Sequence, residues 1–347
     1  MDYLVTRDKN IMHKSPKKYF LIFSVLIFSF TLESFSQPQL WKRERHHLLF
    51  GLGSSGFMGD LGGADRIGSQ GIRDFNFAAV RPAATVGYRY LLLENLALAT
   101  TFSFAYVSGD DRHTNEIYRN NRNIHFRSPI IEVAPKLQYY FYNFQREGAR
   151  HRRVTRAGTR RALDMSFYAF GGIAGFYFNP QGYFEAENYI NWGRGTIPVS
   201  ELPSDGWYNL QPLRTEGQGF FRTREKYSRI SVAIPFGLGA LLNVNRNISV
   251  GLELGFRKTF TDYIDDVSTT YVDPGLFHEI FDDPAMIALA EYFSNPTNGN
   301  LGDLVTSPGQ QRGSPYGTDT YFFTLITLHY RLGQTGAIRS PRQFWGR

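Results

Sequence analysis

Polar and ionisable side chains recur at every second or fourth position within three otherwise apolar segments. Residues two apart in an extended strand point to the same face, so each segment turns its polar members to one side. They are Glu132, Lys136 and Gln138, then Glu253 and Arg257, then His329 and Arg331. Opposite charges enclosed by a narrow barrel have to pair with each other or with trapped water. The spacing predicts a polar network that fills a β-barrel, and its alternative is a gated pore or proton path.

No catalytic constellation accompanies these residues. The chain has no serine-nucleophile motif, no HExxH and no phosphate-binding glycine loop. Asp262, Asp265 and Asp266 could hold Ca²⁺, but they lack the spacing of an EF-hand loop. His113 and His278 are scattered candidates for catalysis at an outer rim. We therefore expect a protein that is not an enzyme and has no catalytic residue, cofactor or metal.

Residues 144–163 form a strongly basic connector opposed by Glu147 alone. Its arginines are Arg146, Arg150, Arg152, Arg153, Arg156, Arg160 and Arg161. Guanidinium groups pair well with phosphates and carboxylates, and such a cluster suits lipid headgroups or an acidic protein. Two interpretations stay open: a solvated basic turn resting on lipid, and a patch that binds a periplasmic partner.

Residues 1–36 read as an export signal. Lys14, Lys17 and Lys18 precede the short uncharged apolar run 19–30, and small residues Ser34 and Ser36 suit cleavage after Ser36. The run is too short for a membrane helix, which needs about 20 apolar residues. A start at Met12 is the alternative to a start at residue 1. We expect an outer-membrane location in a Gram-negative bacterium, without access to nucleic acid despite the net charge of +7.

Composition agrees with a membrane barrel. The 347 residues include no cysteine, so no disulfide framework is expected. Aromatic residues make up 16% of the chain, and they are typical of the girdles that surround such barrels at the membrane interfaces.

Eight segments have the length and alternation of transmembrane strands. They are 47–58, 81–91, 95–108, 127–143, 164–178, 227–242, 247–260 and 320–332. Large apolar residues such as Phe102, Ile234 and Leu252 share one face, with small or charged residues on the other. A water-soluble barrel would turn the large residues inward, whereas here they should face lipid. Pro135 and Pro235 fall inside two segments, and we expect bulges or weak pairing there because proline cannot donate to the ladder.

The connectors alternate between long and short, apart from 144–163. The long ones are 59–80, 109–126, 179–226 and 261–319, and the short ones are 92–94 and 243–246. Outer-membrane barrels have long extracellular loops and short periplasmic turns. The pattern predicts an all-β fold: an eight-stranded antiparallel up-and-down transmembrane barrel over 47–332, between periplasmic segments 37–46 and 333–347. Asp283 and Pro284 should begin a short helix that packs over the barrel mouth.

The first strand and its exit, FGLGSSGFMGDLGG, end in a turn with Phe57, Gly59, Asp60 and Leu61. Together with segments 81–90, 117–123 and 126–141, this turn resembles a family of small outer-membrane β-barrels of Bacteroidota that includes the PorG-like barrels of type IX secretion. The resemblance implies an eight-stranded barrel and, for PorG-like members, a periplasmic partner ring.

The role expected from these observations is that of a monomeric barrel in outer-membrane lipid, serving as an anchor or interaction protein. It would contact a periplasmic secretion-type assembly through the arginine-rich connector. One alternative is a surface-binding or adhesin-like barrel that acts through 179–226 and 261–319, and a second is a small pore.

Overall fold

The computed structural model describes residues 45–61, 80–112, 114–143, 165–193, 195–245, 247–314 and 317–332, all within the compact unit Trp41–Arg347. The export signal, the tail 333–347 and the arginine-rich connector lie outside the described residues. The segment 37–46 is described only at its last two positions.

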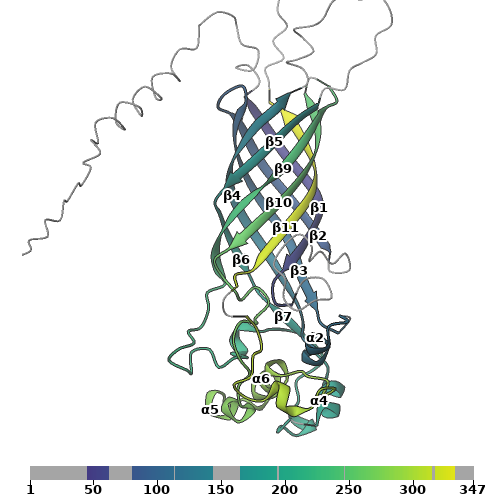
Figure 1. Ribbon diagram of the computed structural model, residues 1–347, viewed down its shortest axis with the longest axis vertical. Coiled ribbons are helices and arrows are strands. Elements are labelled where there is room, and N and C mark those ends of the chain that lie inside the picture. Colours follow the sequence, from purple (N-terminus) through teal and green to yellow (C-terminus); the bar gives the residue numbers. More distant parts are fainter. Residues whose placement is uncertain are drawn as a thin grey trace, which may run out of the picture. The chain divides into compact units, whose positions relative to one another are not determined.

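The segments with alternating apolar and polar residues form a closed ring of antiparallel strands (Figure 1). The strands of the wall are β1 (His46–Met58), β2 (Arg81–Leu91), β3 (Leu96–Asp110), β4 (His125–Asn143), β5 (Met165–Gly172), β6 (Ala174–Phe178), β9 (Ile230–Asn243), β10 (Ile248–Thr259) and β11 (Thr320–Arg331). Each pairs with its neighbours along the chain, and β1 pairs with β11 to close the ring. β5 and β6 both pair with β4 and β9, so they are two pieces of one strand. The predicted eight-stranded up-and-down barrel is confirmed.

The two prolines explain why the fifth strand is divided. Pro135 of β4 lies opposite Ile173, the residue between β5 and β6, and Pro235 of β9 lies opposite Gly172, the last residue of β5. Neither proline can donate to the ladder. Pairing resumes on both sides of the gap in the same register, so the weak pairing that we expected is present without a bulge. The register shift in this sheet instead lies between Tyr140 and Tyr142.

The outer surface of the barrel is apolar. Leu52, Ile326 and Leu252 are register neighbours on β1, β11 and β10, and they are 71%, 64% and 55% exposed. Phe102 and Ile234 are also exposed. Large residues outside and polar residues inside are the arrangement of a barrel in the outer membrane, which places this protein there. Among the described residues, no helix is both long enough and apolar enough to span a membrane.

The two ends of the barrel differ in their connections. At one end, Leu92 N donates to Leu96 O (2.9 Å) and Val244 N donates to Ile248 O (3.0 Å), which closes two tight turns. At the other end lie the long connectors 111–124, 179–229 and 260–319, whose described residues we call the loop cap. By the rule of long extracellular loops, this end faces the cell surface.

The loop cap has its own secondary structure and apolar core. It contains α2 (Ile117–Arg122), β7 (Gln181–Phe184), α4 (Ala186–Trp192), η4 (Val199–Glu201), β8 (Gly206–Asn209), η5 (Gln211–Leu213), η6 (Pro274–Leu276), α5 (Phe277–Ile280), α6 (Pro284–Ser294) and η7 (Asp303–Thr306). Helix α6 begins as predicted, with Asp283 Oδ1 accepting from Ala285 N at 3.1 Å. It packs against α5, η5 and η6, and Phe293 contacts the ring of Phe184. The other elements of the loop cap were not predicted.

Candidate functional site

The barrel interior holds a buried ion pair near the loop-cap end. Arg257 Nε on β10 lies 3.1 Å from Glu132 Oε2 on β4, and the hydroxyl of Tyr321 donates to the same oxygen at 2.7 Å. Arg257 also donates to the carbonyl of Gly255 and lies over the ring of Phe323, 4.1 Å from its centroid. All the charge in this layer is therefore paired and enclosed by aromatic rings.

A second layer pairs Lys136 with Glu253. Lys136 Nζ lies 2.5 Å from Glu253 Oε1, and the hydroxyl of Tyr168 donates to Glu253 Oε2 at 2.8 Å. The ammonium group also lies 4.5 Å from the centroid of Phe170. The structure thus brings the four central charges that the sequence singled out into two separate pairs.

The third layer, toward the tight turns, is built on Arg89. Its Nη2 lies 2.8 Å from His47 Nδ1, and its Nη1 donates to the hydroxyl of Tyr140. His329 Nε2 contacts Thr327 Oγ1 at 3.0 Å, and Arg331 Nη2 donates to Asn243 Oδ1 at 2.5 Å.

The sequence singled out His329 and Arg331 but missed Arg89, Tyr168 and Tyr321. The alternation along the strands could have identified them. Arg89, for example, is four positions from the buried Thr85 and is therefore on the same face of its strand. An eight-stranded barrel is just wide enough for side chains to fill it, and these three layers fill it.

The turn that carries the family resemblance joins the first strand to the loop cap. Asp60 Oδ2 accepts from Ser314 N at 2.6 Å, and Leu61 N donates to Asp265 Oδ2 at 3.1 Å. Phe57 packs edge-on against Phe126, with the ring centroids 5.1 Å apart. A Cβ on Gly59 would meet the Phe57 ring at 2.4 Å. These residues have a structural role in the fold, and the family assignment stays a prediction.

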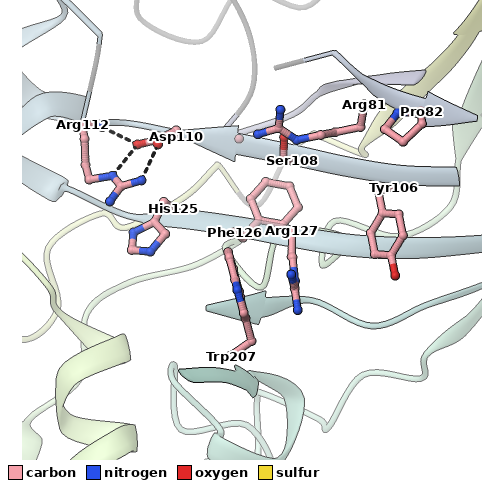
Figure 2. A pocket seen from close by; sticks show the side chains of 11 residues that line it. Arg81, Pro82, Tyr106, Ser108, Asp110, Arg112, His125, Phe126, Arg127 and Trp207 are labelled. Atoms are coloured by element: carbon pink, nitrogen blue, oxygen red, sulfur yellow. Dashed lines mark hydrogen bonds and ion pairs between the residues drawn. The ribbon is translucent and has the colours of Figure 1, made fainter. Parts of the chain in front are cut away.

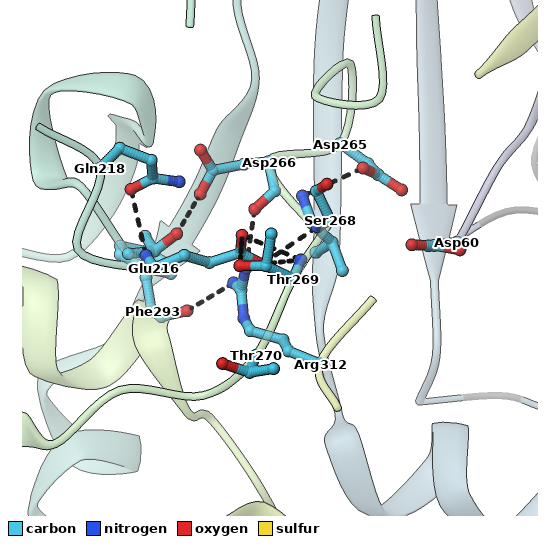
Figure 3. A network of polar contacts seen from close by, with 12 residues as sticks. Asp60, Glu216, Gln218, Asp265, Asp266, Ser268, Thr269, Thr270, Phe293 and Arg312 are labelled. Carbon is cyan, nitrogen blue, oxygen red and sulfur yellow. Dashed lines mark hydrogen bonds and ion pairs between the residues drawn. The ribbon is translucent and has the colours of Figure 1, made fainter. Parts of the chain in front are cut away.

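Behind this turn, a buried polar network ties the long loops together (Figure 3). Glu216 accepts from the backbone of Ser268 and Thr269 and pairs with Arg312 Nη1 at 2.9 Å. Arg312 also donates to the carbonyls of Asp266 (2.7 Å) and Phe293 (3.1 Å). One guanidinium group therefore holds loop 179–229, loop 260–319 and helix α6 in a fixed arrangement.

Arg122 likewise links separate segments of the chain, because its guanidinium group contacts the first, second and fourth long connectors. Its Nε pairs with Asp111 Oδ2 at 2.7 Å, and its other nitrogens donate to the carbonyls of Asp60 (2.7 Å) and Arg312 (2.8 Å). Despite burial, the paired carboxylate raises the pKa of Arg122, so it stays charged.

Several carboxyl groups of the loop cap have raised pKa values because they are buried. Burial raises the pKa of Asp262 to about 8 and, against the opposing charge of Arg312, that of Asp266 to about 6. Burial also raises the pKa values of Asp265 and Asp319, and the charge of nearby carboxylates adds to the effect. Within the described residues, no group of three or more His, Cys, Asp or Glu side chains is arranged to hold a metal ion.

An open cleft of about 430 Å³ lies where three of the long loops meet. Asn123 follows α2, α4 contributes Asn188, Asn191 and Trp192, and α6 and the chain after it contribute Tyr292, Pro296, Thr297, Asn298 and Gly299, with Arg112 at the edge. The lining is rich in amides and aromatic rings. A cleft with a few placed polar groups beside apolar rings is the usual form of a small-molecule site.

The sequence also singled out the arginine-rich connector, His113 and His278. The seven arginines from Arg146 to Arg161 and His113 lie outside the described residues. His278 is hydrogen-bonded to Thr196 Oγ1 (2.7 Å), and its Nε2 lies 3.4 Å from Glu291 Oε1.

Among known proteins, the similarities found are to solved structures only. No family model and no curated protein matches it. The structure is similar to that of Ail, the attachment invasion locus protein of Yersinia pestis, solved in complex with the heparin analogue sucrose octasulfate (TM-score 0.33, 8% identity, 83% of this chain and 99% of Ail covered).

Two further solved structures are similar. For Neisserial surface protein A, the TM-score is 0.31 and the sequence identity is 6%; the match covers 82% of this chain and 96% of that protein. The N-terminal β-barrel domain of Pseudomonas aeruginosa OprF has a TM-score of 0.27, 8% identity, and 83% and 98% coverage. At such low scores these likenesses carry no argument about ligand or role, and the assignment to the class of outer-membrane β-barrels rests on the strand pairing and the apolar exterior.

Proposed function

We propose that this protein is a non-enzymatic outer-membrane barrel that binds a ligand at the cell surface through its loop cap. The observation that carries the proposal is the folding of 179–229 and 260–319 into one body with an apolar core and a shared arginine, Arg312. Ordering a chain costs about 1–2 kcal/mol per residue in backbone entropy. Loops that only connect strands do not need this order, whereas a binding surface gains from being preorganised.

The filled interior disfavours the alternative of a small pore. The three polar layers around Arg257, Lys136 and Arg89 occupy the width of an eight-stranded barrel. The anchor role through the arginine-rich connector stays a prediction, because that connector lies outside the described residues.

The amide-lined cleft is the proposed ligand site, and a neutral saccharide is the proposed ligand class. Asn191 is exposed at the cleft, and no other described residue is hydrogen-bonded to its amide. An amide offers both a donor and an acceptor, which suits vicinal sugar hydroxyls, and the rings of Trp192 and Tyr292 suit the apolar faces of a sugar. The four asparagines of the lining carry no charge and Arg112 is paired with Asp110, so a neutral ligand fits better than an anion.

A glycan array tests this proposal with the full-length protein in lipid nanodiscs. We expect binding to a subset of neutral oligosaccharides, weakened about tenfold or more by Asn188→Ala with Asn191→Ala, since each lost hydrogen bond weakens binding several-fold. Arg222→Gln, an exposed change elsewhere in the loop cap, serves as the control. The proposal fails if no neutral saccharide binds, or if the double variant binds as well as the parent.

A further inference from the structure

We propose that a basic groove at the loop-cap end of the barrel wall binds the phosphate group of an outer-leaflet glycolipid. The groove has a volume of about 390 Å³ and lies where β2 begins, β3 ends and β4 begins, beside β8 (Figure 2). Its lining includes Arg81, Tyr106, Arg112, Arg127 and Trp207. This groove shares Arg112 with the edge of the amide-lined cleft, but the proposal does not depend on the function proposed above.

The groove has an excess of positive charge. Arg112 is held by Asp110 through two nitrogens, at 2.9 and 2.7 Å. Arg127 has no carboxylate partner among the described residues: Nε donates to Gln181 Oε1 at 3.0 Å, which leaves both terminal nitrogens available. Within the part of the chain that the structure describes, the Arg81 side chain makes one long contact, from Nη1 to the carbonyl of Val80 at 3.5 Å. Two of the three guanidinium groups therefore have no counter-charge among the residues that the structure describes.

Arg127 is held in place for recognition. Its guanidinium group lies over the ring of Trp207, 3.9 Å from the centroid, while Gln181 of β7 fixes its Nε. A stacked arginine keeps its planar fork in one orientation, which suits the paired oxygens of a phosphate. The loop cap, through β7 and β8, thus positions a side chain that belongs to the barrel wall.

The groove continues the lipid-facing wall of the barrel. Arg127 shares its strand face with Ile131 and Val133, which are exposed on the apolar exterior. Four residues of strand separate Arg127 from Ile131, about 13 Å along the strand. Tyr106 packs edge-on against the exposed Phe104 and also lines the groove.

This position selects a lipid as the source of the phosphate. Aromatic rings mark the boundary between hydrocarbon and water in membrane barrels, so the groove begins at the depth of the headgroups. It lies at the loop-cap end and so in the outer leaflet. A phosphorylated glycolipid can place its acyl chains on the apolar wall and its phosphate between Arg81 and Arg127, whereas a phosphate free in solution makes only the second contact.

Binding of lipid A to the full-length protein in a neutral detergent tests the proposal. The probes are diphosphorylated lipid A, the same lipid after enzymatic removal of its phosphates, and inorganic phosphate as competitor. The variant is Arg81→Gln with Arg127→Gln, and its control is Arg222→Gln with Lys226→Gln, which removes the same charge from exposed positions of the loop cap. Arg81→Lys with Arg127→Lys keeps the charge and loses the planar fork.

We expect the parent and the control to bind diphosphorylated lipid A equally, and the glutamine variant to bind it at least about tenfold more weakly. The lysine variant should bind diphosphorylated lipid A more weakly than the parent and more tightly than the glutamine variant. Heat-modifiable migration on a gel reports whether each variant folds, and Arg127→Gln alone replaces the double variant if that one does not.

Three outcomes would overturn the proposal: equal binding of the dephosphorylated lipid, full binding by the glutamine variant, and displacement of the lipid by inorganic phosphate at equal concentration.

Discussion

Arg257 on β10 and Glu132 on β4 face each other across the barrel interior, from strands that are not neighbours in the wall. Two guanidinium nitrogens reach the carboxylate, at 3.1 and 3.3 Å, and both side chains are fully buried. A pair in this position cannot be exchanged for water without opening the ring of strands. It therefore links the two sides of the barrel as well as filling its interior.

Breaking this pair should destabilise the barrel strongly. Arg257→Met leaves Glu132 buried without its partner, and we expect a loss of about 3–5 kcal/mol in the free energy of unfolding. The double change Arg257→Met with Glu132→Gln should recover most of the loss, because no unpaired charge remains. Denaturant titration in lipid vesicles measures both. Equal stability of the two variants would show that the ion pair is not a coupled unit.

The apolar exterior predicts that substitution by arginine destabilises the protein much more at Ile326 than at Leu304, although both side chains are exposed. Ile326→Arg places a charge against lipid near the middle of the barrel wall and should cost about 2–4 kcal/mol. Leu304→Arg is its matched control, since Leu304 is 83% exposed but lies in the loop cap, where water solvates the new charge. Denaturant titration of both variants in vesicles checks this. Similar losses at the two positions would contradict the membrane assignment.

The loop cap should lose stability as pH rises from about 4 to about 8. The pKa of Asp262 is about 8 in the folded state, and that of Asp266 is about 6, above the ordinary value of 3.8. In that range the folded state holds protons that the unfolded state has released, so raising the pH favours unfolding. Limited proteolysis of the loops at pH 5 and pH 8.5 measures the change.

Asp262→Asn should reduce this pH dependence, because the amide does not ionise. Asp273→Asn is a suitable control, since Asp273 is exposed and only caps a short turn. A loop cap that is cleaved equally at the two pH values would contradict the expectation.

The filled interior predicts that the protein does not conduct ions. Reconstituted in a planar bilayer, the parent protein should give no stepwise current, because Lys136, Glu253 and Tyr168 close the middle of the barrel. A general porin inserted into the same bilayer is the positive control. Reproducible current steps from the purified protein would instead favour the small-pore alternative.

Strand positions, barrel closure and the polar interior could all be predicted from the chain. In a strand between lipid and a narrow interior, alternate side chains face the lipid and the interior. The sequence of the strand therefore alternates between residue types that suit each side. This is why the predicted bounds of the strand at Arg81–Leu91 agree fully and the others differ by only a few residues. The start of α6 was also readable, because a capping Asp283 followed by Pro284 is a local signal.

Local patterns did not reveal the loop cap, the cleft or the basic groove. Leu61 and Asp265 are hydrogen-bonded across 204 positions of the chain, and Arg122 and Arg312 across 190. Trp207 reaches Arg127 only because β7 joins β4 to β8. The surroundings of loop residues do not repeat along the chain, so the sequence of a loop has no regular pattern. The contacts of its residues depend on how distant segments pack. The alternation of side chains thus decides where the barrel lies and what fills it, whereas long-range contacts alone decide what it presents at the cell surface.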